Sequence, residues 1–259
     1  MVNLDELRSR TAGTHYEALS PNMGTKLLLM DDDTTVWEIR LEPGEATTMC
    51  RSDYWYDLIH LRGDELTVVP HAETRGEWNT VNTLPIQPKT SNLVAPGGAD
   101  LFVNTGKTPY LGYKVELPQL HAERGYRPES RWGRFLMHSG TYDRMCDVMR
   151  KIPLEMLEET IGTDLHYEDE DIQLWSMRLE PCELGPLHRH LHEYCCIYAR
   201  GDRTGGFANP LLFEKQPEYD ERNVCIGKVD FNHPGGSELS INTGHERYRV
   251  VQILFRKNG

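Results

Sequence analysis

Long apolar stretches are missing from this sequence of 259 residues, and so are concentrations of positive charge. No apolar run approaches the roughly 18 residues that a membrane-spanning helix needs. No run of lysine and arginine exceeds two residues, and the formal net charge is -12. Nucleic acids and anionic membrane surfaces are bound through concentrated basic patches, so we expect neither of them as a partner.

Regular cysteine spacing and nucleotide-binding motifs are also missing. Six cysteines lack the short spacing of a disulfide framework or a zinc finger: Cys50, Cys146, Cys182, Cys195, Cys196 and Cys225. The N-terminal segment MVNLDELRSRTAG has no apolar core of the kind that secretory signals carry. We therefore expect reduced thiols in a cytoplasmic protein. GxGxxG, GxxxxGK[ST] and GxSxG do not occur, so nothing indicates a nucleotide cofactor or a serine hydrolase.

What the sequence does contain is an internal repeat. After a shift of 138 positions, Gly24–Leu117 aligns with Gly162–Phe255 without a gap, and about a quarter of the pairs are identical. The identities fall in two dense blocks. The first aligns VWEIRLEPGEATTMCRSDYWYDLIHLRGD with LWSMRLEPCELGPLHRHLHEYCCIYARGD. The second aligns PGGADLFVNTGKTPY with PGGSELSINTGHERY. Two dense matches in one register indicate two copies of one domain. We predict an extension over residues 1–23, domains over 24–120 and 162–259, and a connector over 121–161.

Within each copy the pattern is typical of β-structure. Short alternating segments such as VWEIRL, QLWSMRL and YRVVQILF are separated by turn signals, which favours an all-β barrel or sandwich. The connector differs, because Tyr142–Gly162 places apolar residues at helical spacing. A helix interrupted near Pro153 is expected there, since proline removes a backbone donor.

The second copy contains the segment LHRHLHEY. On a continuous strand, side chains alternate between faces, so His188, His190 and His192 would project to one side. Three crowded imidazoles inside a barrel would leave donors and acceptors unsatisfied, and a divalent metal resolves this. The alternative is that the histidines face solvent or line a polar pocket that holds no metal.

These residues resemble the two-part signature of the cupin superfamily. The first part is matched by Gly185, His188, His190, Glu193 and Gly201. The second part has the family spacing G-x-x-H-x-x-x-N, here with Gly235, Glu238 and Asn242. Because both copies cover most of the chain, the resemblance implies a bicupin. It implies two tandem jelly-roll (double-stranded β-helix) barrels, each built to hold a metal with three histidines and a carboxylate.

The sequence departs from the family pattern in two places. Glu193 follows His190 after only two residues, so strict alternation turns Glu193 outward and His192 inward. Glu238 stands where the family has its last histidine, and a carboxylate can replace it as a ligand. Asp100 occupies the same place in the first copy, which leaves a structural role for Glu238 open. The predicted metal ligands are His188, His190, His192 and Glu238.

The first copy is predicted to hold no metal. At the positions of the predicted ligands it has Cys50, Ser52 and Tyr54, with Trp55 in place of Glu193. A thiol, a hydroxyl and aromatic rings make a poor site for a hard or borderline divalent ion. We expect this barrel to be structural or to bind a small apolar ligand.

Similarity to metal-binding cupins implies a metal-dependent enzyme acting on a small organic molecule, foremost a non-haem Fe(II) dioxygenase. Zn, Ni or Mn are alternative ions, and no organic cofactor is expected. Tyr194 or Tyr198 is a candidate to position the substrate through its phenolic hydroxyl. A metal-dependent lyase or isomerase, with His192 as base, and a non-catalytic small-ligand-binding bicupin are the alternatives. Homo-oligomerisation also stays open.

Overall fold

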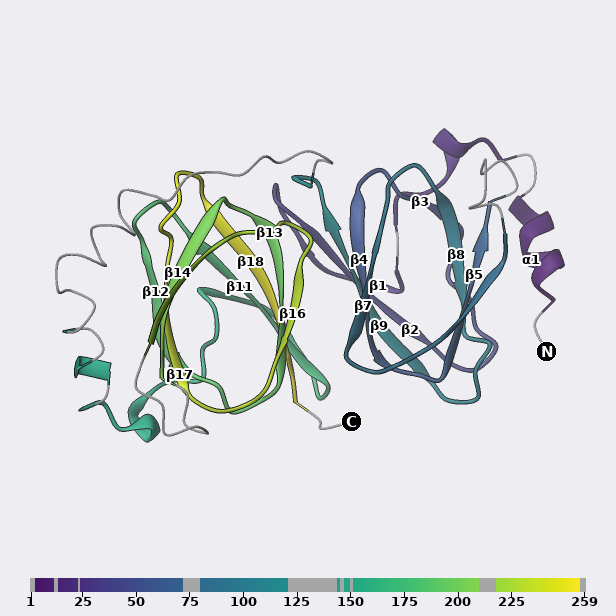
Figure 1. Ribbon diagram of the computed structural model, residues 1–259. Coiled ribbons are helices and arrows are strands. Elements are labelled where there is room, and N and C mark those ends of the chain that lie inside the picture. Colours follow the sequence, from purple (N-terminus) through teal and green to yellow (C-terminus); the bar gives the residue numbers. More distant parts are fainter. Residues whose placement is uncertain are drawn as a thin grey trace. The chain divides into compact units, whose positions relative to one another are not determined.

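The computed structural model describes residues 3–11, 14–22, 24–71, 80–120, 144, 147–149, 151–209 and 218–256. Its contacts divide the chain into two compact units, Met1–Pro118 and Gln119–Asn258. Each unit is built from strands, drawn as arrows in Figure 1. The helical elements with assigned bounds are short: α1 (Leu4–Thr11), η1 (Tyr16–Ala18) and η3 (Leu154–Met156).

The first unit consists of two antiparallel sheets. The five-stranded sheet has the order β1-β2-β9-β4-β7, and the four-stranded sheet has the order β3-β8-β5-β6. The strands are β1 (Lys26–Met30), β2 (Thr35–Leu41), β3 (Cys50–Arg51), β4 (Trp55–Arg62), β5 (Glu65–Pro70), β6 (Asn82–Pro85), β7 (Thr90–Val94), β8 (Ala99–Val103) and β9 (Tyr110–Leu117). Neighbours in each sheet that are distant in sequence, such as β2 and β9, give the jelly-roll arrangement.

The second unit repeats this design. Its sheets have the orders β10-β11-β18-β13-β16 and β12-β17-β14-β15. The strands are β10 (Asp164–Glu168), β11 (Ile172–Leu179), β12 (Leu184–Arg189), β13 (Tyr194–Arg200), β14 (Arg203–Asn209), β15 (Glu218–Asn223), β16 (Val229–Asn232), β17 (Ser237–Ile241) and β18 (Tyr248–Phe255). In Figure 1 these strands run from green to yellow and enclose the interior of the second barrel. The predicted all-β fold of two tandem jelly-roll barrels is confirmed.

Strand pairing in the two units follows the same 138-residue offset as the sequence. Cys50 pairs with Asp100 on β3 and β8, and His188 pairs with Glu238 on β12 and β17. The offset also holds for the middle of each copy, where the sequences share no identity: Leu66 pairs with Leu84, and Thr204 pairs with Arg222. Positions 138 apart are therefore structurally equivalent throughout the two barrels.

The residues that are identical in the two copies mostly build turns. The glycine of each Arg-Gly-Asp turn is left-handed, with φ of 130° at Gly63 and 123° at Gly201, a conformation that glycine adopts without a steric penalty. The aspartate that follows Gly201 accepts hydrogen bonds from the backbone N–H groups of His245 and Glu246. These contacts tie the turn after β13 to the turn before β18.

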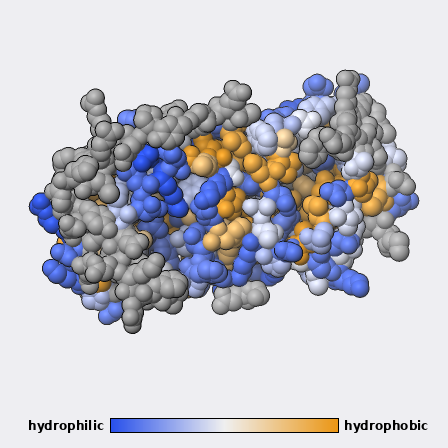
Figure 2. Space-filling model, in the orientation of Figure 1, coloured by the Kyte–Doolittle hydropathy of each residue, from blue (hydrophilic) through white to orange (hydrophobic). Residues whose placement is uncertain are grey.

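The connector lies largely outside the described residues, including most of the predicted helix from Tyr142 onward. Residues 147–149 are helical, and η3 begins directly after Pro153, where we expected an interruption. Among the cysteines that the structure describes, five are free thiols, and Cys146 falls outside that part. No described helix has the length and apolar character needed to cross a membrane. On the visible face of each unit, hydrophilic residues cover much of the surface and hydrophobic residues are interspersed among them (Figure 2).

Candidate metal centre

Strand pairing brings a histidine and a glutamate together in the second barrel. His188 on β12 lies directly opposite Glu238 on β17, so their side chains leave the sheet on the same face. His190 follows just after β12 and is fixed by backbone hydrogen bonds: its N–H donates to Gly236 and its carbonyl accepts from Gly235. One ligand atom from each of His188, His190 and Glu238 lies within 4.8 Å of the others.

His188 has a nitrogen without a partner. Its Nδ1 lies 2.9 Å from the carbonyl oxygen of Pro186, which can only accept, so Nδ1 carries the proton. Nε2 is then an acceptor, and it is buried with no hydrogen-bond partner. Burial, together with the charge of His190, lowers the pKa of His188 and favours the neutral ring. A neutral imidazole with its second nitrogen held by a carbonyl is how histidine is presented to metals.

His190 is also buried and incompletely satisfied. Its Nε2 lies 3.6 Å from Oε2 of Glu238, whereas its Nδ1 has no hydrogen-bond partner. The ring stacks on that of Tyr194 at a centroid distance of 4.6 Å and meets the ring of His188 edge-on at 4.7 Å. These contacts fix the orientation of both imidazoles.

Glu238 supplies the negative charge of the group. Burial acts to raise its pKa, but the contact with His190, the charges of both histidines and a hydrogen bond from Ser240 outweigh burial and lower it to about 2. The Ser240 hydroxyl donates to Oε1 at 2.9 Å. Glu238 is therefore ionised at neutral pH, and Oε2 faces the histidines.

The donor set fits a divalent metal ion. Two imidazoles and one carboxylate with further positions open make up the set that non-haem Fe(II) sites use, and zinc accepts the same ligands. The unpartnered buried nitrogen of His188 would gain its missing partner by binding the ion. His188, His190 and Glu238 would hold it.

The structure does not bring His192 into this group. Strand β12 ends at Arg189, so the alternation that would point His192 inward stops before that residue is reached. Glu193 lies outside the group as well, and its carboxylate is 3.5 Å from Nδ1 of the exposed His233. Of the four predicted ligands, three converge and His192 does not.

A small polar cavity adjoins the group inside the barrel. It has a volume of about 50 Å³, and His188, Glu238, Tyr194, Tyr198, Arg222 and Gln252 are among the residues that line it. This volume holds one or two water molecules, since a water occupies about 30 Å³ in the liquid. It is far smaller than the roughly 300–1,000 Å³ typical of ligand pockets.

The two tyrosine candidates differ in their surroundings. The Tyr198 hydroxyl donates to Asp230 at 3.2 Å and accepts from Nη2 of Arg222 at 2.9 Å, so its proton is already committed. In the described part of the chain, the Tyr194 hydroxyl has no hydrogen bond, and burial raises its pKa, which keeps it protonated. Tyr194 can therefore donate a hydrogen bond into the cavity, whereas Tyr198 orients its neighbours.

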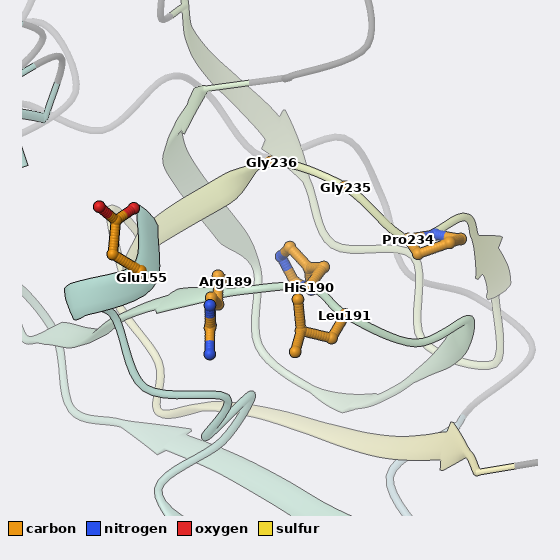
Figure 3. Close-up of a pocket in the computed structure, with 7 residues that line it drawn as sticks. All are labelled: Glu155, Arg189, His190, Leu191, Pro234, Gly235 and Gly236. Carbon is orange, nitrogen blue, oxygen red and sulfur yellow. The ribbon is translucent and has the colours of Figure 1, made fainter. Parts of the chain in front are cut away.

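A second and larger pocket opens at the end of the barrel beside His190. It has a volume of about 410 Å³. Figure 3 shows the His190 ring beneath the Gly235–Gly236 backbone, with Leu191 beside it and Glu155 of η3 to one side. His190 lines this outer pocket, and His188 and Glu238 line the inner cavity. The metal group therefore stands between the two.

At the equivalent position, the first barrel has no comparable group. Cys50 donates through Sγ to the carbonyl of Asp100, and the Lys114 ammonium lies 3.3 Å from the Ser52 hydroxyl. Across the residues described, His188, His190 and Glu238 are the one set found with metal-ligand geometry. That the first barrel holds no metal stays a prediction.

Comparisons with known proteins show the following. No family model matches the chain, and no curated protein matches it. One solved structure that matches is AerE from Microcystis aeruginosa, which is 12% identical and has a TM-score of 0.32. The match covers 92% of this chain and 98% of AerE. A salicylate 1,2-dioxygenase from Pseudaminobacter salicylatoxidans matches with 11% identity, 97% and 81% coverage, and a TM-score of 0.31.

A vicilin from Corylus avellana (hazelnut) matches with 11% identity, 87% and 75% coverage, and a TM-score of 0.31. Identities and TM-scores this low carry no argument about function. The description of two jelly-roll units stands on the strand order and on the register that the two units share.

Proposed function

We propose that the second barrel is the active site of a metal-dependent enzyme that acts on a small organic molecule, foremost as a non-haem Fe(II) dioxygenase. The observation that carries this proposal is the convergence of His188, His190 and Glu238 within 4.8 Å, with a buried nitrogen of His188 left unpartnered. A plain core would not retain such a nitrogen, because an unsatisfied buried acceptor costs about 1–3 kcal/mol.

When bound, Fe(II) would supply open coordination positions for substrate oxygens and for dioxygen. The protein's own contribution is orientation and exclusion of water. The Tyr194 ring holds His190 by stacking, and its hydroxyl would donate to a substrate oxygen that enters the inner cavity. The outer pocket beside His190 is large enough to receive the body of a small organic molecule.

The size of the inner cavity supports a second candidate, a bicupin that binds a small ligand without turning it over. About 50 Å³ beside the metal group leaves little room for two reactants in this conformation. Metal content and turnover distinguish the two functions. One iron per chain, with both atoms of the consumed dioxygen incorporated into the product, supports the dioxygenase, whereas a barrel that binds a ligand without turnover supports the binder.

The first experiment measures metal in the purified chain and in two matched double variants. His188→Ala with His190→Ala should lose the ion, while Cys50→Ala with Ser52→Ala, at the equivalent positions of the first barrel, should keep about one per chain. Spectroscopy of a nitric oxide adduct then tests for open positions on iron. Full metal stoichiometry in the His188/His190 double variant would refute the proposed site.

A further inference from the structure

The interiors of the two barrels differ in polarity at equivalent positions. At four positions around the inner cavity the second barrel is more polar than the first, whereas at the positions of Glu238 and Gln252 the first barrel also has polar residues, Asp100 and Lys114. The pairs, 138 positions apart, are Cys196 and Leu58, Arg222 and Leu84, Asn232 and Val94, and Ser240 and Phe102. The four apolar partners all belong to, or pack against, one hydrophobic core cluster. The fold alone therefore does not require polar residues here.

A polar interior costs stability unless each group finds a partner. Gln252 shows that one partner is still missing. Its side chain is 4% exposed, it lines the cavity, and its Oε1 has no hydrogen-bond partner. A water or a ligand hydroxyl in the cavity would satisfy this acceptor.

Arg222 is the cationic side chain that lines this cavity. Its Nη2 donates to the Tyr198 hydroxyl, and its Nη1 lies 3.9 Å from Asp230. Asp230 is held more closely by Lys228, whose ammonium is 2.7 Å from Oδ1. The guanidinium has five N–H donors in a fork that matches a carboxylate. It is thus positioned by Tyr198 and retains donors for a ligand.

Charge balance favours an anion in this cavity. Glu238 and Arg222 are the charged residues that line it, and they neutralise each other. A divalent ion held by Glu238 would leave an excess of positive charge beside the half-exposed Arg222 side chain. A negatively charged group between the ion and Arg222 would remove that excess.

We propose that the ligand of this site is a small carboxylate, whose carboxylate group enters the inner cavity between the metal ion and Arg222. This inference rests on the proposed metal site and deepens it by naming the substrate class. Arg222 then determines the specificity for a carboxylate, and Tyr198 positions the Arg222 guanidinium. The small volume admits the carboxylate end and excludes larger groups from this position.

The test uses the full chain loaded with Co(II), whose visible absorption reports on its ligands. Acetate is the probe, and acetamide, which has the same shape without charge, is its control. Acetate should change the Co(II) spectrum saturably, and acetamide should not. In Arg222→Gln the acetate affinity should fall about tenfold or more, because a charge-assisted fork of hydrogen bonds is lost.

Arg222→Lys should bind acetate with intermediate affinity, since it keeps the charge and loses the fork. Arg247→Gln is the matched control, because Arg247 pairs with Glu180 away from the cavity and should leave acetate binding unchanged. Equal acetate affinity in Arg222→Gln and the parent protein overturns the inference. So does the absence of any acetate effect while Co(II) is bound one per chain. Failure to bind Co(II) at all refutes the metal site itself, and the inference with it.

Discussion

The ammonium group of Lys114 lies 3.6 Å from the centre of the Tyr56 ring, inside the first barrel. The equivalent residues of the second barrel are Gln252 and Tyr194, which line the cavity beside the metal group. The first barrel thus has a covalently attached cation beside the position where the second barrel has its candidate metal ligands. This contact helps to accommodate a fully buried lysine in the first barrel.

Lys114 should give the first barrel a measurable pH dependence. Burial lowers its pKa to about 8 in the folded state, while nearby acidic groups partly oppose this. Between about pH 8 and the ordinary value near 10.5, the unfolded chain binds more protons than the folded chain, so stability rises with pH in this window. Across this pH window, the free energy of unfolding of the parent protein should rise by on the order of 1–3 kcal/mol more than that of Lys114→Met.

Chemical unfolding at closely spaced pH values measures this difference. Gln252→Met is the control, since the equivalent residue of the second barrel does not titrate and its replacement should leave the slope unchanged. A parent protein and a Lys114→Met variant with parallel stability profiles from pH 8 to 10.5 would contradict the assignment.

Two buried asparagines should contribute equally to the two barrels. The Asn242 amide donates to the carbonyls of Leu179 and Glu246, and its oxygen accepts from the Gly244 N–H. Asn104 makes the same three bonds one repeat earlier. Replacing either by alanine should destabilise its unit by about 2–4 kcal/mol, because buried backbone groups lose their partners.

A measurement of metal binding shows whether Asn242 supports only the fold or also the metal site. Asn242→Ala should lower the midpoint of thermal unfolding, and the folded variant should still bind one ion. Asn104→Ala supplies the comparison in the barrel without a metal group. A selective loss of metal in folded Asn242→Ala would show that the residue does more than hold the turn.

Much of this fold could be predicted because its signals are local or repeated. Alternating strands and turn glycines indicate β-barrels, and the gapless repeat transfers each inference from one copy to the other. His188, His190 and Glu238 could be found from their spacing. His192 was misplaced because alternation was extended past Arg189, where β12 ends and the chain turns toward β13.

Arg222 and Gln252 were missed for a different reason. Neither lies in a recognised motif, and Arg222 sits on β15, which is distant in sequence from the histidines. Only the closed barrel brings them to one cavity. For Arg222 a usable signal was present in the repeat, since the apolar Leu84 stands at the same position of the first barrel. A polar residue in one copy at a position where the other copy is apolar therefore directs attention to the interior of that barrel.

The two cavity tyrosines should respond differently to loss of their hydroxyls. Tyr198→Phe removes a partner from both Asp230 and Arg222 and should cost about 1–2 kcal/mol of stability. Tyr194→Phe removes a hydroxyl without a hydrogen bond in the described structure, so stability should change by less than about 0.5 kcal/mol. Its effect should instead be weaker ligand binding, measured by acetate titration of the Co(II) form. Equal stabilities of the two variants would contradict this division.

Glu238 decides which kind of metal site the second barrel holds. If it is a ligand, Glu238→Gln should weaken metal affinity about tenfold or more, because a neutral oxygen replaces a charged one at the same position. Glu238→His restores the spacing G-x-x-H-x-x-x-N and should retain the ion. Asp100→Asn makes the matched change opposite Cys50 in the first barrel and should leave metal affinity unaltered.

Titration of the metal-free protein with Fe(II) under argon gives the affinities, and thermal unfolding is followed separately. A carboxylate that only supports the fold would lower the unfolding midpoint of Glu238→Gln while leaving its affinity for iron intact. That outcome is disfavoured by the geometry, since the carboxylate faces both histidines and only one of its oxygens is held by Ser240. Unchanged affinity would nevertheless remove Glu238 from the ligand set and leave His188 and His190 as the remaining protein ligands of the group.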